Sequence, residues 1–202
     1  WVGSKLDDRT SGRDSCQIII DETSSLSRKV DHRILSSRDG NLNIDILKDK
    51  LESFLPHTVF FAAHGSPTSI ALDGQQFDCK DADGLQNSFP HIYLAMSCLT
   101  NFFDRDSLTE HLLRNDKGGA VAAWACSRFG WYRPGEAGYG DSELILKDFF
   151  ELLNRDYLDE APSLGELSHR ARRRYMDRAR SDGTFRWLTF GMNLLGCPEL
   201  PI

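Results

Sequence analysis

Three apolar runs constrain the fold of this chain more than any other feature. They are TVFFAA (58–63), HIYLAM (91–96) and AVAAWAC (120–126), and apolar residues fill them almost without interruption. A strand with one face in water would alternate apolar and polar residues, so runs of this kind are typical of strands buried on both faces. The pattern predicts an α/β fold with a mostly parallel sheet covered by helices on both faces.

The segments between and after these strands carry helix signals. Apolar stripes at helical spacing or capping-box signatures mark four of them: NIDILKDKLESFL (43–55), SLTE (107–110), SELILKDFFELLNRDYL (142–158) and PSLGE (162–166). A short helix is also expected over 85–89. The β-branched run CQIIID (16–21) predicts one further strand, ahead of the three apolar ones.

Size and composition favour one domain over residues 1–202. Apolar residues make up 40% of the 202, enough for a sizeable core. No apolar run approaches the roughly 20 residues of a membrane span. The net charge of −6 and pI of about 5.5 do not indicate a nucleic-acid-binding surface. Because the sequence starts at Trp1 and stops at PELPI, we expect a fragment of a longer chain, lacking N-terminal and C-terminal parts.

The cysteines do not indicate a disulfide scaffold. There are five of them, an odd number, so at least one thiol is expected to be free. None forms a CxxC pair, and no cluster of cysteines and histidines has the usual zinc spacing.

Two chemically active residues follow successive predicted strands. His64 comes directly after the first apolar run and Cys98 shortly after the second. Ligands of parallel sheets bind beyond the carboxyl ends of the strands, so neighbouring strands would bring the imidazole and the thiol together. An imidazole can take the proton of a cysteine nucleophile and later protonate the leaving amine. The sequence therefore predicts a catalytic Cys98–His64 pair.

Gly65 extends this prediction. A residue without a side chain lets its N–H approach a substrate carbonyl, and together with the N–H of Cys98 it could form an oxyanion hole. Taken singly, a His-Gly pair after a strand is usually a turn, and a buried cysteine is usually a small hydrophobic residue. Their joint placement on successive strand ends favours catalysis.

A set of ordered segments resembles a known family. HGSPTSIALDG, AMSCLTNFFD, SLTEHLLRNDKGGAVAAWACSRFGW, SLGEL and RWLTFGMNLLGCPELPI are similar to the conserved blocks of the gingipain family of peptidases, from about residue 42 to the end. The wider group of caspase-like cysteine peptidases shares the His-Gly and the cysteine after successive strands. The caspase signature QACxG is absent, and the separation of 98 − 64 = 34 residues is shorter than the roughly 50 of caspases.

The resemblance implies a caspase-like fold and cysteine endopeptidase activity on a protein or peptide substrate. It assigns Cys98 as nucleophile, His64 as base, and Gly65 with Cys98 as the oxyanion hole. No cofactor is required; the family often carries structural calcium, for which no ligands are assigned here. The resemblance also implies a secreted or cell-surface protein.

Two departures from the family pattern motivate an alternative function. Ala63 stands where the family usually has glycine, and Cys197 stands where an aspartate is expected. The alternative is a catalytically silent caspase-like module that binds a partner or docks in an assembly. Retention of both His64 and Cys98 favours the enzyme. A serine hydrolase is set aside because no GxSxG motif occurs.

The loop SRFGWYRPG (127–135) follows the third strand and is expected to wall the substrate cleft. Trp131, Trp124 and Arg128 are the candidate substrate-binding residues, against the simpler interpretation that these side chains pack on the core. An acidic specificity pocket has three unspecific candidates: Asp21, Asp73 and Asp104. The arginine-rich run HRARRRYMDRAR (169–180) is interpreted as the solvated face of a helix.

Overall fold

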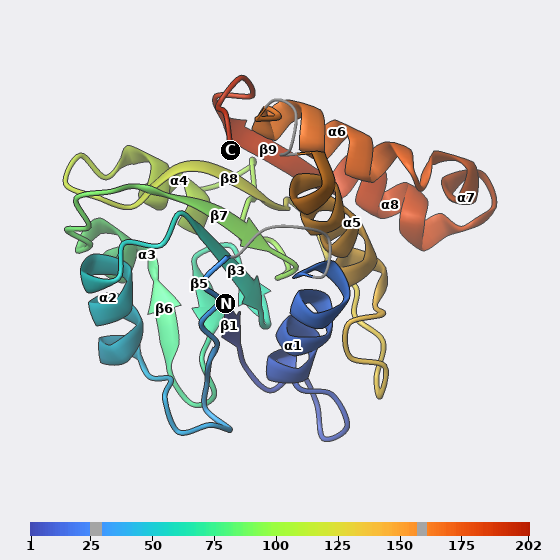
Figure 1. The fold of residues 1–202 in the computed structure, drawn as a ribbon. Helices are drawn as coiled ribbons and strands as arrows, with labels where there is room; N and C mark the ends of the chain where they lie inside the picture. Colours follow the sequence, from blue (N-terminus) through green and yellow to red (C-terminus); the bar gives the residue numbers. More distant parts are fainter. Residues whose placement is uncertain (25–29, 157–160) are drawn as a thin grey trace.

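A six-stranded sheet forms the centre of the computed structural model, which describes residues 1–24, 30–156 and 161–202 (Figure 1). Its strands, in spatial order, are β2 (Leu35–Ser36), β1 (Val2–Gly3), β3 (Thr58–Ala62), β7 (His91–Ala95), β8 (Ala120–Cys126) and β9 (Met192–Gly196). The strands pair in parallel except β9, which runs antiparallel to β8. The predicted α/β fold with a mostly parallel sheet is confirmed.

Helices cover both faces of this sheet, as the apolar strands predict. Successive side chains of a strand point to opposite faces, so Phe60 of β3 packs in one core while Val59 and Phe61 pack in the other. Helices α2 (Ile44–Ser53), α3 (Cys79–Asp83) and α4 (Leu108–Arg114) lie on one face. On the other lie α1 (Gly12–Thr23), α5 (Asp141–Asp156), α6 (Leu164–Arg173), α7 (Met176–Ser181) and α8 (Gly183–Gly191).

The predicted helix starts at 43, 107 and 163 are confirmed by their capping contacts. Asn43 accepts a hydrogen bond from the N–H of Ile46 at 2.8 Å, which satisfies a donor that the first turn leaves without an intrahelical partner. Ser107 and Glu110 form the capping box of α4. Ser163 caps α6 through the N–H of Glu166 at 3.2 Å.

The prediction of a strand at 16–21 is wrong, because these residues lie inside helix α1. The side chain of Ser11 caps this helix, and Cys16, Ile19 and Ile20 lie on its buried face. Burial at spacings of three and four outweighs the β-propensity of the three isoleucines.

Two other expectations on helices are corrected. The short helix expected over 85–89 lies instead at Cys79–Asp83, where Asp78 and Asp81 form a capping box. The arginine-rich run is divided between α6 and α7, with a break at Arg174 and Tyr175. Residues 157–158 of the predicted amphipathic segment lie outside the described residues.

A small antiparallel sheet follows His64 directly. It consists of β4 (Gly65–Ser66), β5 (Ser69–Ala71) and β6 (Gln76–Asp78). The turn between β5 and β6 places Asp73 at φ 49° and Gly74 at φ 96°. Two successive positive φ angles are typical of the Asp-Gly hairpin turn, so this turn was detectable in the sequence.

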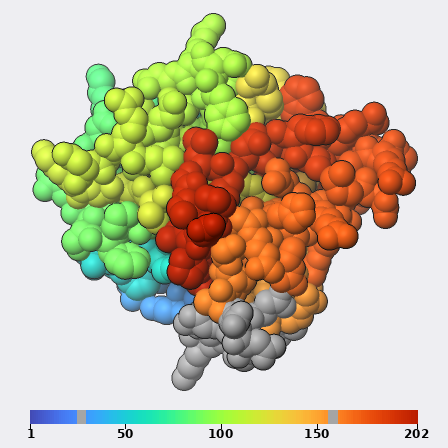
Figure 2. All heavy atoms as spheres, turned by 90° about the horizontal axis from the view of Figure 1, so that it is seen from above, coloured from blue at the N-terminus to red at the C-terminus, as the bar shows by residue number. Residues whose placement is uncertain are grey.

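The C-terminal residues lie on the surface beside α6 (Figure 2). The N–H of Leu164 donates to Leu200 at 2.9 Å, the N–H of Gly165 to Pro198 at 2.7 Å, and the N–H of Ile202 to Pro162 at 3.2 Å. Each helix in the described part of the chain is too short or too polar to cross a bilayer.

Candidate active site

His64 and Cys98 follow neighbouring strands at matched positions. Strands β3 and β7 pair with Phe61 opposite Ala95, and each candidate residue lies three positions beyond its member of that pair. The N–H of Met96 donates to the carbonyl of Phe61 at 3.1 Å, which continues the pairing past β7. Both residues therefore leave the sheet at its carboxyl edge, where parallel sheets bind ligands.

Gly65 lies against the backbone of Cys98. A Cβ atom at position 65 would meet the Cys98 carbonyl oxygen at 2.6 Å and the Ser97 Cβ at 2.9 Å. Contacts this short exclude any side chain, so the glycine is required by close approach of the two chains. The structure thus brings the two predicted oxyanion-hole residues together.

The backbone is strained immediately after Cys98. Leu99 has φ 60°, a left-handed conformation that is uncommon for a residue with a side chain. Its N–H donates to the carbonyl of Arg128 at 2.9 Å, and the N–H of Asn101 donates to Cys126 at 3.1 Å. Bonds to the end of β8 hold this turn in place, and strained residues of this kind cluster at functional sites.

The imidazole of His64 is oriented by a backbone carbonyl. Its Nε2 lies 2.6 Å from the oxygen of Leu6, in the loop that follows β1. A carbonyl oxygen only accepts, so Nε2 carries the hydrogen and Nδ1 of the neutral ring is the basic atom. The ring of Tyr132 packs edge-to-face on the imidazole, with the centroids 5.7 Å apart. The Leu6 carbonyl and Tyr132 are site groups that the sequence analysis missed.

The thiol of Cys98 is partly buried and has a partner of its own. Its Sγ lies 3.6 Å from the carbonyl oxygen of Gly130. Burial raises the pKa of Cys98, so the group is a thiol at neutral pH. In this conformation the thiol and the His64 imidazole each bond to a backbone carbonyl.

The loop after β8 packs against the end of β7. A Cβ on Gly130 would lie 2.1 Å from the carbonyl oxygen of Met96, so the loop touches the end of β7. The N–H of Trp131 donates to the hydroxyl of Ser142 at 2.8 Å. Further along, the buried carboxyl of Glu143 accepts bonds from two N–H groups of this loop.

The three candidate substrate-binding residues have different environments. Trp131 is 45% exposed and directly follows Gly130, the residue in contact with the Cys98 thiol. Arg128 forms a 2.8 Å ion pair with Asp104 and lies over the ring of Phe102.

The expectation for Trp124 is wrong, because it is fully buried in β8. Its ring packs against Phe149, with the centroids 5.2 Å apart. Strands on both sides and helices on both faces enclose this position, so the tryptophan belongs to the core.

One group of side chains in the described part of the chain could hold a metal: Cys79, Asp106 and His111. Calcium prefers six to eight oxygen ligands, so a group that offers one sulfur, one nitrogen and one carboxylate does not fit it. These three residues are therefore not a calcium site.

The model of peptidase family C25 matches residues 55–202. A comparison with curated protein sequences found no match. The crystal structure of the Arg specific cysteine proteinase gingipain R is similar with a TM-score of 0.70 and 16% identity, over 100% of this chain and 46% of that one.

Two further solved structures are similar. The complex of Porphyromonas gingivalis RgpB pro- and mature domains gives a TM-score of 0.68 at 15% identity, over 100% of this chain and 47% of that one. A structure described as that of a protease gives 0.51 at 14% identity, over 70% and 34%. This chain thus spans about half the length of the first two structures, and at these identities the likeness shows the fold.

Proposed function

Since this chain belongs to peptidase family C25, we propose that it hydrolyses peptide bonds with Cys98 as nucleophile and His64 as general base. The observation that carries the proposal is that His64 and Cys98 each lie three residues beyond a paired position of β3 and β7. Gly65 packs against the Cys98 backbone at the same place. A nucleophile, a base and backbone donors then meet at one sheet edge, as covalent acyl transfer requires.

The proposed reaction begins with proton transfer from the Cys98 thiol to Nδ1 of His64. The sulfur attacks the substrate carbonyl carbon, an S–C bond forms, and the carbonyl oxygen takes the negative charge. The N–H groups of Gly65 and Cys98 would stabilise this oxyanion. The C–N bond then breaks as the His64 imidazolium protonates the leaving amine, and a thioester remains on Cys98.

Water completes the proposed cycle. His64 takes a proton from the water as it attacks the thioester, and the S–C bond breaks to release the carboxylic acid and the thiol. The Leu6 carbonyl, 2.6 Å from Nε2, holds the ring for both steps and stabilises the imidazolium that forms in each.

The reaction requires the thiol to leave the Gly130 carbonyl. Rotation about the Cα–Cβ bond of Cys98 moves the sulfur without a change in the backbone, and catalytic hydrogen bonds are often loose before substrate binds. Because burial raises its pKa, the thiol needs the base for activation rather than ionising alone.

Trp131 is the residue that we propose for substrate contact, with Arg128 beside it. The exposed indole follows the loop residue that touches the Cys98 thiol, so a bound peptide would cover it. Apolar burial there would contribute on the order of 25 cal/mol per Å².

The second candidate function is a catalytically silent module. The observation that favours it is that the imidazole of His64 and the thiol of Cys98 each bond to a backbone carbonyl in this conformation. A silent module would keep the fold without a reactive thiol.

Labelling with peptidyl acyloxymethyl ketones of varied P1 residue tests the proposal. Such a probe needs an activated thiol, a formed oxyanion hole and a fitting pocket together. We expect one label per chain on Cys98, found by mass mapping, and no label in His64→Ala. Cys197→Ser, which changes an exposed cysteine, is the control and should label like the parent. Labels spread over other cysteines, no label at all, or peptide hydrolysis by Cys98→Ala would contradict the proposal.

A further inference from the structure

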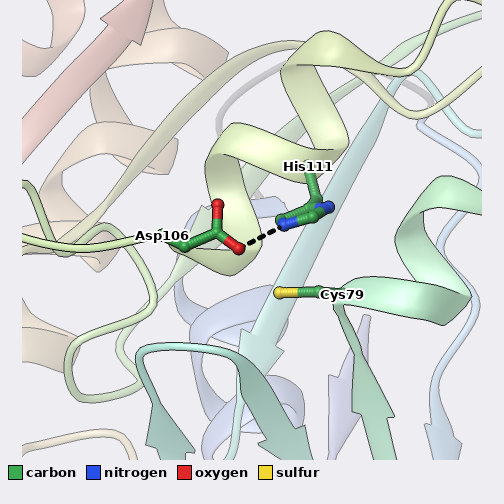
Figure 3. Close-up of side chains that lie close together, drawn as sticks. All are labelled: Cys79, Asp106 and His111. Carbon is green, nitrogen blue, oxygen red and sulfur yellow. Dashed lines mark hydrogen bonds and ion pairs between the residues drawn. The ribbon is translucent and has the colours of Figure 1, made fainter.

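A sulfur, a nitrogen and a carboxylate oxygen converge between helices α3 and α4, on residues that the proposed peptidase reaction does not use. Cys79, Asp106 and His111 point toward one another there (Figure 3), and their potential ligand atoms all lie within 4.8 Å of one another. We propose that these three residues form a binding site for a divalent transition metal, of which Zn²⁺ fits best.

The three side chains come from well-defined elements. Cys79 is the first residue of α3, a helix whose start is fixed by the capping box of Asp78 and Asp81. His111 lies within α4, and Asp106 immediately precedes the Ser107 cap of that helix. Ligands held by helix starts and caps need little reordering to bind an ion.

The hydrogen bonds of His111 prepare it for a metal. Its Nδ1 lies 2.7 Å from an oxygen of Asp83, while its Nε2 lies 2.8 Å from an oxygen of Asp106. A histidine ligand usually donates its other ring N–H to a carboxylate, which fixes the tautomer and makes the ligating nitrogen more basic. Asp83 has this position, so Nε2 is the atom that would bind the ion.

The distances suit a small tetrahedral ion after a modest shift. Zinc bonds of about 2.0–2.1 Å to nitrogen and oxygen place the two ligand atoms roughly 3.3 Å apart. The carboxylate of Asp106 must therefore retreat about half an ångström from His111 as the metal replaces the proton between them. The Asp106 side chain is 62% exposed, which leaves it free to move and leaves the ion a path to enter.

The chemistry of the ligands selects the metal class. Thiolate and imidazole ligands suit zinc and its transition-metal neighbours, whereas calcium and magnesium take oxygen ligands. Three protein ligands leave the fourth tetrahedral position to water.

A metal here would strengthen the loops that follow the proposed catalytic residues. The N–H of Leu108 in α4 donates to Pro67 at 2.8 Å, and the N–H of Cys79 donates to Thr68 at 3.1 Å, just after His64 and Gly65. The N–H of Thr109 donates to Thr100 at 3.1 Å, just after Cys98. An ion that joins α3 to α4 would thus fasten both segments.

Titration with Co²⁺, an optical probe for zinc sites, tests this inference. The Cys98→Ala protein is used, because it removes the other thiol that is proposed to pair with a histidine. We expect tetrahedral cobalt bands with a thiolate charge-transfer band, both displaced by Zn²⁺. Cys79→Ser should abolish the charge-transfer band, and Asp83→Asn should weaken binding about 10–100-fold. Cys197→Ser is the control and should bind like the parent.

Two results would overturn the inference. One is the absence of a thiolate band in the Cys98→Ala protein. The other is an undiminished band in Cys79→Ser, or in His111→Gln if the serine variant does not fold. Because the readout is optical and the protein has no Cys98 thiol, the result is independent of the proposed peptidase activity.

Discussion

Burial raises the pKa of four cysteine thiols in this protein, and Cys98 is one of them. The pKa values of Cys16 and Cys126 rise to about 12, and that of Cys79 rises to about 11. Intrinsic acidity therefore does not single out Cys98. Its position does, because it lies past the end of β7, beside Gly65 and level with His64.

Substitution of Gly65 gives the most specific prediction for a single residue. In Gly65→Ala the new Cβ would lie 2.6 Å from the Cys98 carbonyl oxygen, so one of the two backbones must shift and the proposed oxyanion hole opens. We expect kcat for a peptide substrate to fall about 10²–10³-fold, the usual cost of one lost oxyanion donor.

The matched control is Gly183→Ala at the start of α8, where a Cβ meets nothing within 4 Å. That variant should keep the parent kcat. A Gly65→Ala protein with a kcat within about twofold of the parent would show that the N–H of residue 65 has no part in catalysis.

Helix starts in this chain are set locally, whereas the identity of some elements is not. The caps at 43, 107 and 163 depend on a side chain and an N–H two or three residues later, so short sequence patterns reveal them. The run CQIIID is helical because one face of it is buried against the sheet and α5, and this burial outweighs its β-propensity.

The cap residue Asn43 provides a prediction about the stability of a single helix. Its side chain caps α2 through the N–H of Ile46, and Asn43→Ala should lower the free energy of unfolding by about 1 kcal/mol. Asn43→Gly should cost only a few tenths, because glycine is itself an acceptable cap residue. Urea unfolding of the three proteins measures both values. Equal losses in the two variants would mean that the side-chain bond contributes nothing.

The parallel sheet as a whole encloses His91, the first residue of β7. The imidazole is 1% exposed, and its Nδ1 has no hydrogen-bond partner among the described residues. Desolvation lowers the pKa of His91 from 6.5 to about 4. Between pH 6.5 and about 4 the unfolded chain binds a proton on His91 that the folded protein does not bind. Stability therefore falls as the pH drops through this range.

We expect this histidine to cost about 3 kcal/mol of stability between about pH 7 and about pH 4. His91→Leu should remove that loss, so its urea midpoint should change less with acid than the midpoint of the parent. His169→Leu, which changes an exposed histidine, is the control. Its urea midpoint should vary with pH as that of the parent does. If the parent and His91→Leu lose stability equally on acidification, another group is responsible.

The sequence by itself determined three buried strands of the main sheet, the starts of several helices and the two residues proposed for catalysis. Each of these depends on a local property: apolar runs identify strands enclosed on both faces, capping side chains bond within one turn, and strand ends carry His64 and Cys98. Parallel pairing then directs the carboxyl ends of neighbouring strands to one edge of the sheet, where ligands of such sheets bind.

Tertiary structure alone decided which groups meet at that edge and which tryptophan is exposed. The Leu6 carbonyl that orients His64 is a backbone group from a loop 58 residues earlier in the chain, so no side-chain pattern could reveal it. Trp124 and Trp131 are seven positions apart by sequence number, yet one is enclosed by neighbouring strands and helices while the other is 45% exposed. The convergence of Cys79, Asp106 and His111 likewise depends on the packing of α3 against α4, because contacts between distant segments are fixed by the whole fold.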